Sequence, residues 1–255
     1  MPSASELATV VLQPPPIQVR RVASCNRPAP DGGIPHTVLE EVDATDLAEF
    51  RDYLKRIPFA FGDFFPSMSG RAISSEGEVR LFLETAIPEI CFPVACAMVE
   101  PTGRGWDLGL RSEKSTLEGN LPDMTVQQVF PPQTAASGGQ YSQNTDLMAV
   151  EFKGPGVLNP LRRGNVPKSS DWDALSAQLM KYARVDGFTN VLCCDSDIAI
   201  FLHFTDTSDQ SAKVKYLICR IDGQPLEDPN AQKVTLRELF LFGIWKGLSE
   251  LNDLR

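Results

Sequence analysis

Glu151 and Lys153 are the residues of this sequence whose types and spacing point most directly to chemistry. They flank Phe152 at the end of an apolar run, residues 147–150. Alternate side chains of a β-strand point to opposite faces, so Glu151 and Lys153 share one face and Phe152 takes the other. An acid and a base at the end of an apolar strand are costly to bury without a purpose. We therefore interpret residues 146–155 as the floor of a metal-dependent active site.

A second acid stands before the preceding β-like run. Asp123 follows Pro122 and leads into residues 124–130, and a loop rich in Pro, Ser and Gly connects this run to the strand that ends in Glu151. Carboxylates such as Asp123 and Glu151 are ligands that hold Mg²⁺ or Mn²⁺ and leave room for waters and phosphate oxygens. Lys153 would orient the attacking water or stabilise charge that develops in the transition state. This pattern extends the expected metal-dependent site to the neighbouring strand.

The remaining elements are predicted from hydrophobic periodicity and capping signals. Helices are expected over residues 43–57, 74–100 with a break at Pro88, 170–184 with Ser170 or Asp171 as its cap, and 235–251. Strands are expected over residues 106–110, 124–130, 146–153, 189–194, 198–204 and 213–221. Residues 1–36 are rich in Pro and weakly periodic, which is typical of an arm packed on a domain. The core order is therefore helix, strand, strand, strand, helix, strand, with additions at both ends.

On these elements the sequence resembles the PD-(D/E)XK, or restriction-endonuclease-like, nuclease superfamily, in the form of a divergent member of the kind found in eukaryotic microbes. The residues that match its motif are Pro122, Asp123, Glu151 and Lys153. Glu76 on the preceding helix and Gln178 with Tyr182 on the following helix resemble patterns of several branches. The resemblance covers residues 72–205. The departures from the pattern are a long loop between the two halves of the motif and an acidic overall charge.

The resemblance implies a fold and a set of metal ligands. The implied fold is α/β, a restriction-endonuclease-like core of order αβββαβ with a mixed central sheet flanked by helices. Residues 1–71 would form an N-terminal arm and helix, and residues 72–255 a nuclease-like domain extended by C-terminal strands and a helix. Asp123 and Glu151 would hold the metal, with Glu76 as a further ligand or a holder of water.

The resemblance also implies roles for Gln178 and for four basic residues. Gln178 would position the nucleophile or a phosphate. The expected nucleic-acid contacts are Arg162, Arg163, Lys168 and Lys181. The implied reaction is metal-dependent hydrolysis of a phosphodiester, and the implied cofactor is Mg²⁺ or Mn²⁺. The implied partner is nucleic acid, with DNA favoured over RNA. Many related enzymes form homodimers, so a homodimer is also among the implied assemblies.

Composition and charge restrict the function classes. The formal net charge of −9 is unfavourable for non-specific DNA binding, although a local basic patch suffices. The six Cys residues show no metal-ligand spacing, which indicates reduced thiols in an intracellular protein, and two His residues argue against a His-rich zinc site. The sequence shows no bilayer-length apolar run and no signal-peptide pattern. We therefore expect no membrane partner and a cytoplasmic or nuclear location.

Each candidate residue also has an ordinary structural interpretation. Asp123 suits a turn, and Glu151 with Lys153 suits a solvated cross-strand pair. Glu76 suits the first turn of a helix, and residues 195–197, Asp-Ser-Asp, form a hairpin turn before they form a metal site. The other candidates suit a core or a solvated loop: Gln178, Tyr182, Arg162 and Arg163. With these interpretations the chain keeps the nuclease-like scaffold and acts as a binding or interaction module.

Overall fold

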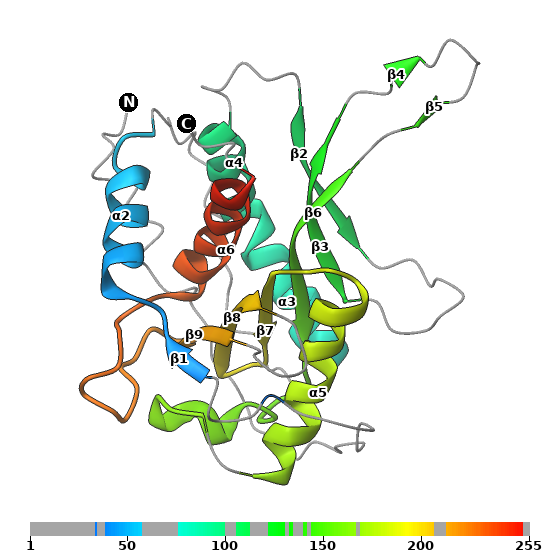
Figure 1. Cartoon of the computed structure of the whole chain (residues 1–255). Coiled ribbons are helices and arrows are strands. Elements are labelled where there is room, and N and C mark those ends of the chain that lie inside the picture. The colour runs from blue at the N-terminus through cyan, green and yellow to red at the C-terminus, as the bar shows by residue number, and fades with distance from the viewer. Residues whose placement is uncertain are drawn as a thin grey trace.

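The computed structural model describes residues 34, 39–57, 76–99, 106–112, 122–130, 133–134, 140–141, 144–166, 169–206 and 213–251. These residues form one mixed seven-stranded sheet flanked by helices, and a separate ribbon of two short strands, β4 and β5 (Figure 1). The predicted α/β class, with a mixed sheet between helices, is therefore confirmed.

The predicted helices and strands appear in the expected order, together with four short elements that were not predicted, at residues 39–41, 133–134, 140–141 and 159–163. The helices are α2 (Ala44–Leu54), α3 (Glu76–Ala86), α4 (Pro88–Val99), the 3₁₀ helix η3 (Asn159–Arg163), α5 (Ser170–Val185) and α6 (Leu236–Glu250). The strands are β1 (Leu39–Glu41), β2 (Asp107–Ser112), β3 (Met124–Val129), β4 (Gln133–Thr134), β5 (Gln140–Tyr141), β6 (Thr145–Phe152), β7 (Asn190–Cys194), β8 (Ile198–Asp206) and β9 (Lys213–Arg220).

The sheet has the strand order β1-β9-β8-β7-β6-β3-β2. β2, β3 and β6 form an antiparallel meander, and β7 lies beside β6 in parallel. A parallel neighbour requires a crossover, and the chain between β6 and β7 carries η3 and α5. β7, β8 and β9 continue antiparallel, and β1 is parallel to β9 at the edge. β6 is therefore a central strand that ends between β3 and β7.

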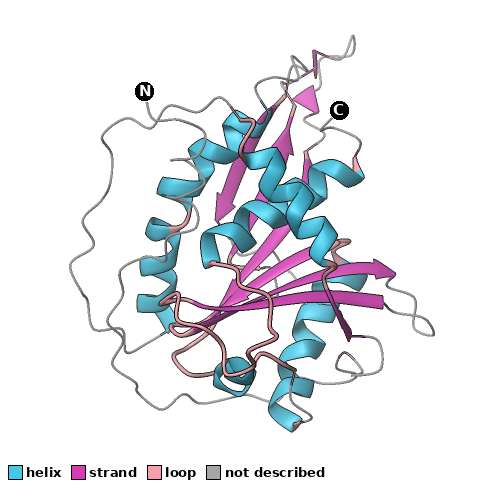
Figure 2. Cartoon of the chain, turned by 90° about the vertical axis from the view of Figure 1, so that its left-hand side faces the viewer, coloured by secondary structure: helices cyan, strands magenta, loops and turns pink. Residues whose placement is uncertain are grey.

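Different helices cover the two faces of the sheet. α2, α3, α4 and α6 bury one face, and Figure 2 shows helices lying across the strands on the side of α2 and α6. Phe242 of α6 packs edge-to-face on Phe50 of α2 and on Phe201 of β8, each with ring centroids 5.4 Å apart. α5 and η3 bury the opposite face. The end of β6 thus lies between two hydrophobic cores.

Two helix boundaries follow directly from local sequence. Ile87 separates α3 from α4 immediately before Pro88, because proline has no N–H to donate to the preceding turn. The predicted break at Pro88 is confirmed. α6 begins with a capping box, in which the side chain of Thr235 accepts from the Glu238 N–H and Glu238 accepts from the Thr235 N–H. Both boundaries are set within a few residues of sequence.

α5 begins at Ser170, as the sequence predicts, but its capping residue differs from the prediction. Ser169 is the N-cap, and its hydroxyl accepts from the backbone N–H of Trp172 at 3.2 Å. The predicted caps, Ser170 and Asp171, lie inside the first turn instead. Consecutive serines offer the same capping chemistry, and Ser169 is the one with the extended backbone of an N-cap, φ −147° and ψ 154°.

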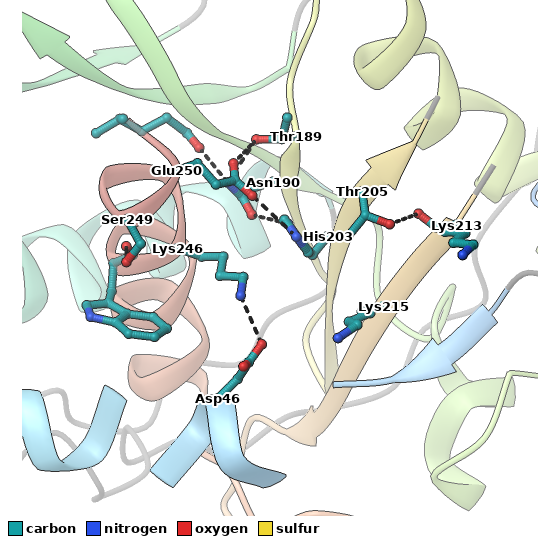
Figure 3. Close-up of polar contacts among 12 residues, drawn as sticks. Asp46, Thr189, Asn190, His203, Thr205, Lys213, Lys215, Lys246, Ser249 and Glu250 are labelled. Carbon is teal, nitrogen blue, oxygen red and sulfur yellow. Dashed lines mark hydrogen bonds and ion pairs between the residues drawn. The ribbon is translucent and has the colours of Figure 1, made fainter. Parts of the chain in front are cut away.

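Polar contacts fasten the C-terminal end of α6 to the sheet (Figure 3). Glu250 accepts from the hydroxyl of Thr189 at 2.9 Å. His203 of β8 is buried, with Nδ1 3.0 Å from Asn190 Oδ1 and Nε2 3.3 Å from Glu250 Oε1. A buried histidine with a polar partner on each ring nitrogen is a packed strand residue that anchors the helix.

Some predictions fall outside the described residues. These include the arm over residues 1–33, the segment 58–75 that contains the predicted domain boundary, and the candidate nucleic-acid contact Lys168. In the part of the chain that the structure describes, none of the helices has the length and apolar character needed to cross a membrane.

Candidate functional site

The ends of β3 and β6 bring the two predicted acids together. Met124 of β3 pairs with Val150 of β6, so the next step of the same antiparallel register sets Asp123 opposite Glu151. A side-chain contact fastens this junction, because Asp123 Oδ2 accepts from the backbone N–H of Phe152 at 2.8 Å. Asp123 therefore does more than mark a turn, because its carboxylate accepts a hydrogen bond from the neighbouring strand.

Glu151 is buried and receives hydrogen bonds on both carboxylate oxygens. Lys153 Nζ lies 2.5 Å from Glu151 Oε1, and Gln178 Nε2 donates to the same oxygen at 2.8 Å. The hydroxyl of Tyr182 donates to Glu151 Oε2 at 2.7 Å. Only 5% of Glu151 is exposed, so the pair of Glu151 and Lys153 is not a solvated cross-strand pair.

Helix α5 supplies the two neutral partners of this carboxylate. Gln178 and Tyr182 are four residues apart and therefore lie on one face of the helix. Gln178 donates to the Tyr182 hydroxyl at 3.0 Å and accepts from Lys153 Nζ at 2.8 Å. These side chains and Glu151 form a closed network in which each partner fixes the orientation of the next.

The surroundings of this network shift the pKa values of its three titratable side chains, Glu151, Lys153 and Tyr182. Burial raises the pKa of Glu151, and the charge of Asp123 adds to the rise, while Lys153 acts in the opposite direction. Burial is the strongest single influence on Lys153 and lowers its pKa, but the charge and hydrogen bond of Glu151, with contributions from Cys193 and Glu76, together outweigh it and the pKa is raised. Burial and the Glu151 charge raise the pKa of Tyr182 well above its ordinary value. Tyr182 is therefore a neutral hydrogen-bond donor, and Lys153 stays positively charged.

Arg80 of α3 is a site residue that the sequence reasoning missed. Its Nη1 donates to Asp123 Oδ1 at 3.0 Å, and its Nη2 donates to the Asp123 backbone carbonyl at 3.3 Å. The side chain of Asp123 is 17% exposed and that of Arg80 32%. The signal in the sequence was a basic residue next to the apolar stripe of the helix before the motif. Nothing in that stripe says which strand end the basic residue faces.

Glu76 does not join Asp123 and Glu151 as a third carboxylate. It is the exposed first residue of α3. Among the described residues there is no group of three or more His, Cys, Asp or Glu side chains placed to hold a metal ion. The charge of Glu76 nevertheless reaches the site, because it contributes to the raised pKa of Lys153. Asp123 and Glu151 remain the two residues with suitable oxygen ligands.

The predicted basic contacts lie in two different places. Arg162 and Arg163 belong to η3, and their backbone carbonyls accept from the N–H groups of Glu227 and Asp228 at 3.2 and 3.1 Å. These contacts place η3 against the loop after β9. Lys181 lies on α5, three residues after Gln178. Of these three basic residues, Lys181 is therefore the one on the helix that carries Gln178 and Tyr182.

The Asp195 carboxylate holds its own turn together and binds the chain segment that follows Lys153. Asp195 is buried, and its carboxylate accepts from the backbone N–H groups of Asp197 at 2.7 Å, Ile198 at 2.8 Å and Leu158 at 2.7 Å. Burial raises its pKa to about 6, against the lowering effect of these bonds. The residues 195–197 therefore form the hairpin turn that sequence favoured, and Asp195 also ties this hairpin to the chain that follows Lys153.

The chain matches no protein-family model and no curated protein. The function is therefore argued from the site itself.

Proposed function

We propose that the protein is a Mg²⁺- or Mn²⁺-dependent nuclease built on a restriction-endonuclease-like core, which hydrolyses phosphodiester bonds of DNA or RNA. The observation that carries the proposal is the meeting of Asp123 and Glu151 at adjacent strand ends, with Lys153 bound to Glu151. The antiparallel meander of β2, β3 and β6, followed by α5 and the parallel strand β7, supports the order expected for such a core.

Asp123 and Glu151 would hold the metal ion, since Mg²⁺ takes oxygen ligands and is commonly bound through one or two carboxylates, waters and phosphate oxygens. When bound, the ion would polarise the phosphate and lower the pKa of a water molecule. Lys153 supplies a fixed positive charge where negative charge develops on the phosphate. Gln178 and Tyr182 hold the Glu151 carboxylate in one orientation. Lys181 on the same helix would meet the nucleic-acid backbone.

One observation favours a second function of a different class. Each carboxylate is already matched with a cation of the protein, Asp123 with Arg80 and Glu151 with Lys153. A site that is neutral in itself is also what a catalytically silent nuclease-like scaffold would contain. Such a scaffold would act as a binding or interaction module. The two functions differ in whether the carboxylates take up a divalent cation.

Cleavage assays separate the two. Purified protein is incubated with single- and double-stranded DNA and RNA in Mg²⁺, Mn²⁺ or excess EDTA, together with the variants Asp123→Asn and Lys153→Gln. The control Asp171→Asn alters an exposed acid on α5 outside the network. The nuclease proposal expects metal-dependent cutting by wild type and control, and a loss of roughly 10²-fold or more in the two site variants. Equal background cutting by all four proteins would reject it, and binding without cutting would favour the interaction module.

A further inference from the structure

Arg80 occupies the carboxylate that the proposed function assigns to the metal. Its guanidinium donates to Asp123 Oδ1, and the backbone N–H of Phe152 donates to Asp123 Oδ2. Both oxygens are thus engaged, one of them by a full positive charge. A guanidinium that touches a metal ligand repels a divalent cation brought to the same oxygen, and the repulsion is strong where water is partly excluded. The Asp123 carboxylate and Arg80 are only 17% and 32% exposed.

We propose that Arg80 is a displaceable guard of Asp123, which holds the carboxylate while the metal is absent and leaves it when a divalent cation binds. This inference rests on the proposed function, because it describes the regulation of the same site. It explains how Asp123 and Glu151, opposite each other at adjacent strand ends, tolerate one another without a metal, since like charges directly opposite on neighbouring strands are destabilising.

Glu76 offers Arg80 a second position. It lies four residues before Arg80 on α3, the spacing at which an acid and a base on one helix face form an ion pair. Glu76 is exposed, so a guanidinium that turns towards it also turns towards solvent. Glu76 would then help metal binding through Arg80 and without touching the metal. This role differs from the metal ligand that the resemblance implied.

Binding of Mn²⁺ alone tests the guard, with no nucleic acid present. Affinity is measured by titration calorimetry and by the electron paramagnetic resonance signal of free Mn²⁺ for wild type, Arg80→Ala and Arg80→Gln. Because one opposing positive charge is removed, both variants are expected to bind Mn²⁺ on the order of tenfold more tightly. Arg80→Gln keeps hydrogen-bonding capacity, so the test survives if Arg80→Ala folds poorly. The control Arg56→Ala removes an exposed arginine beside α2 and should leave the affinity unchanged.

A double-mutant cycle separates the two roles of Glu76. If Glu76 acts through Arg80, Glu76→Gln weakens Mn²⁺ binding several-fold in the wild-type background and has no effect in the Arg80→Ala background. If Glu76 is a metal ligand, the same substitution weakens binding equally in both backgrounds. The second pattern would overturn the role proposed for Glu76.

The guard and the proposed function fail in different ways. Unchanged or weaker Mn²⁺ binding in both Arg80 variants, with wild type still binding, would overturn the guard and leave the nuclease proposal standing. Tighter binding without cleavage of any substrate would support the guard and reject the nuclease. If neither wild type nor the Arg80 variants bind Mn²⁺, and Asp123→Asn cuts nucleic acid no less than wild type, both the guard and the nuclease proposal are overturned.

Discussion

Tyr182 donates its phenolic hydrogen to Glu151 Oε2 at 2.7 Å, while Gln178, one helical turn earlier, donates to Oε1 of the same carboxylate at 2.8 Å. One face of α5 therefore clamps a buried carboxylate from both sides. The clamp explains how Glu151 keeps a single orientation at the end of β6. It also means that the stability of the protein and the geometry of the site depend on the same hydrogen bonds.

The substitution Tyr182→Phe is expected to lower the free energy of unfolding by about 2 kcal/mol, since it leaves a buried carboxylate oxygen without its donor. The matched control is Tyr53→Phe, because the Tyr53 hydroxyl donates at 2.8 Å to the neutral carbonyl of Met98. A bond to a neutral acceptor contributes less, about 1 kcal/mol. Urea unfolding followed by circular dichroism measures both, and equal losses would show that the Tyr182 bond has no charge-assisted character.

The pH dependence of metal binding is expected to follow Glu151. Because burial raises its pKa, the carboxyl protonates, and loses the metal, at a higher pH than an ordinary glutamate. The Lys153 charge lowers this pKa, so Lys153→Met should raise it further and move the acid limb of Mn²⁺ binding to higher pH. The control is Lys55→Met, an exposed lysine paired with Asp52. An acid limb at the same pH in wild type and Lys153→Met would contradict the assignment of the limb to Glu151.

Local sequence signals predicted the helices and strands, but they did not predict every side chain that meets at the site. Pro88 acts on its own helix, and the strand that ends at Glu151 shows its apolar run directly, so both were readable. Arg80 was not readable, because its partner Asp123 lies 43 residues away. Helical periodicity says which face is buried and not which strand end that face meets. The side-chain partners of a site are set by tertiary packing.

The Asp195 turn provides a test of how the chain after Lys153 is held. Asp195→Asn replaces a charged acceptor of three backbone N–H bonds with an amide that has one acceptor oxygen. We expect a loss of about 2 kcal/mol in the free energy of unfolding, and faster hydrogen exchange at the Leu158 amide. Asp228→Asn is the control, since the carboxylate of that partly exposed residue accepts a backbone N–H from Asn230 at the protein surface. Unchanged exchange at Leu158 would show that the hairpin does not anchor this segment.

Acid stability is expected to depend on His203, whose surroundings disfavour its charged form. Burial, together with the charges of Lys246 and Lys215, lowers its pKa from 6.5 to about 4, against the opposing charge of Asp46. A depressed folded pKa stabilises the protein above pH 6.5, and this contribution, about 3 kcal/mol, is lost as the pH falls through about 4.

The substitution His203→Gln removes this titration and keeps a polar side chain beside Asn190. Burial raises the pKa of Glu250, which contributes in the opposite direction, but Glu250 is present in both proteins. Chemical unfolding at intervals between pH 7 and pH 4 should therefore show wild type losing stability more steeply than His203→Gln. Parallel curves over this range would mean that His203 takes up its proton in the folded protein as readily as in the unfolded chain.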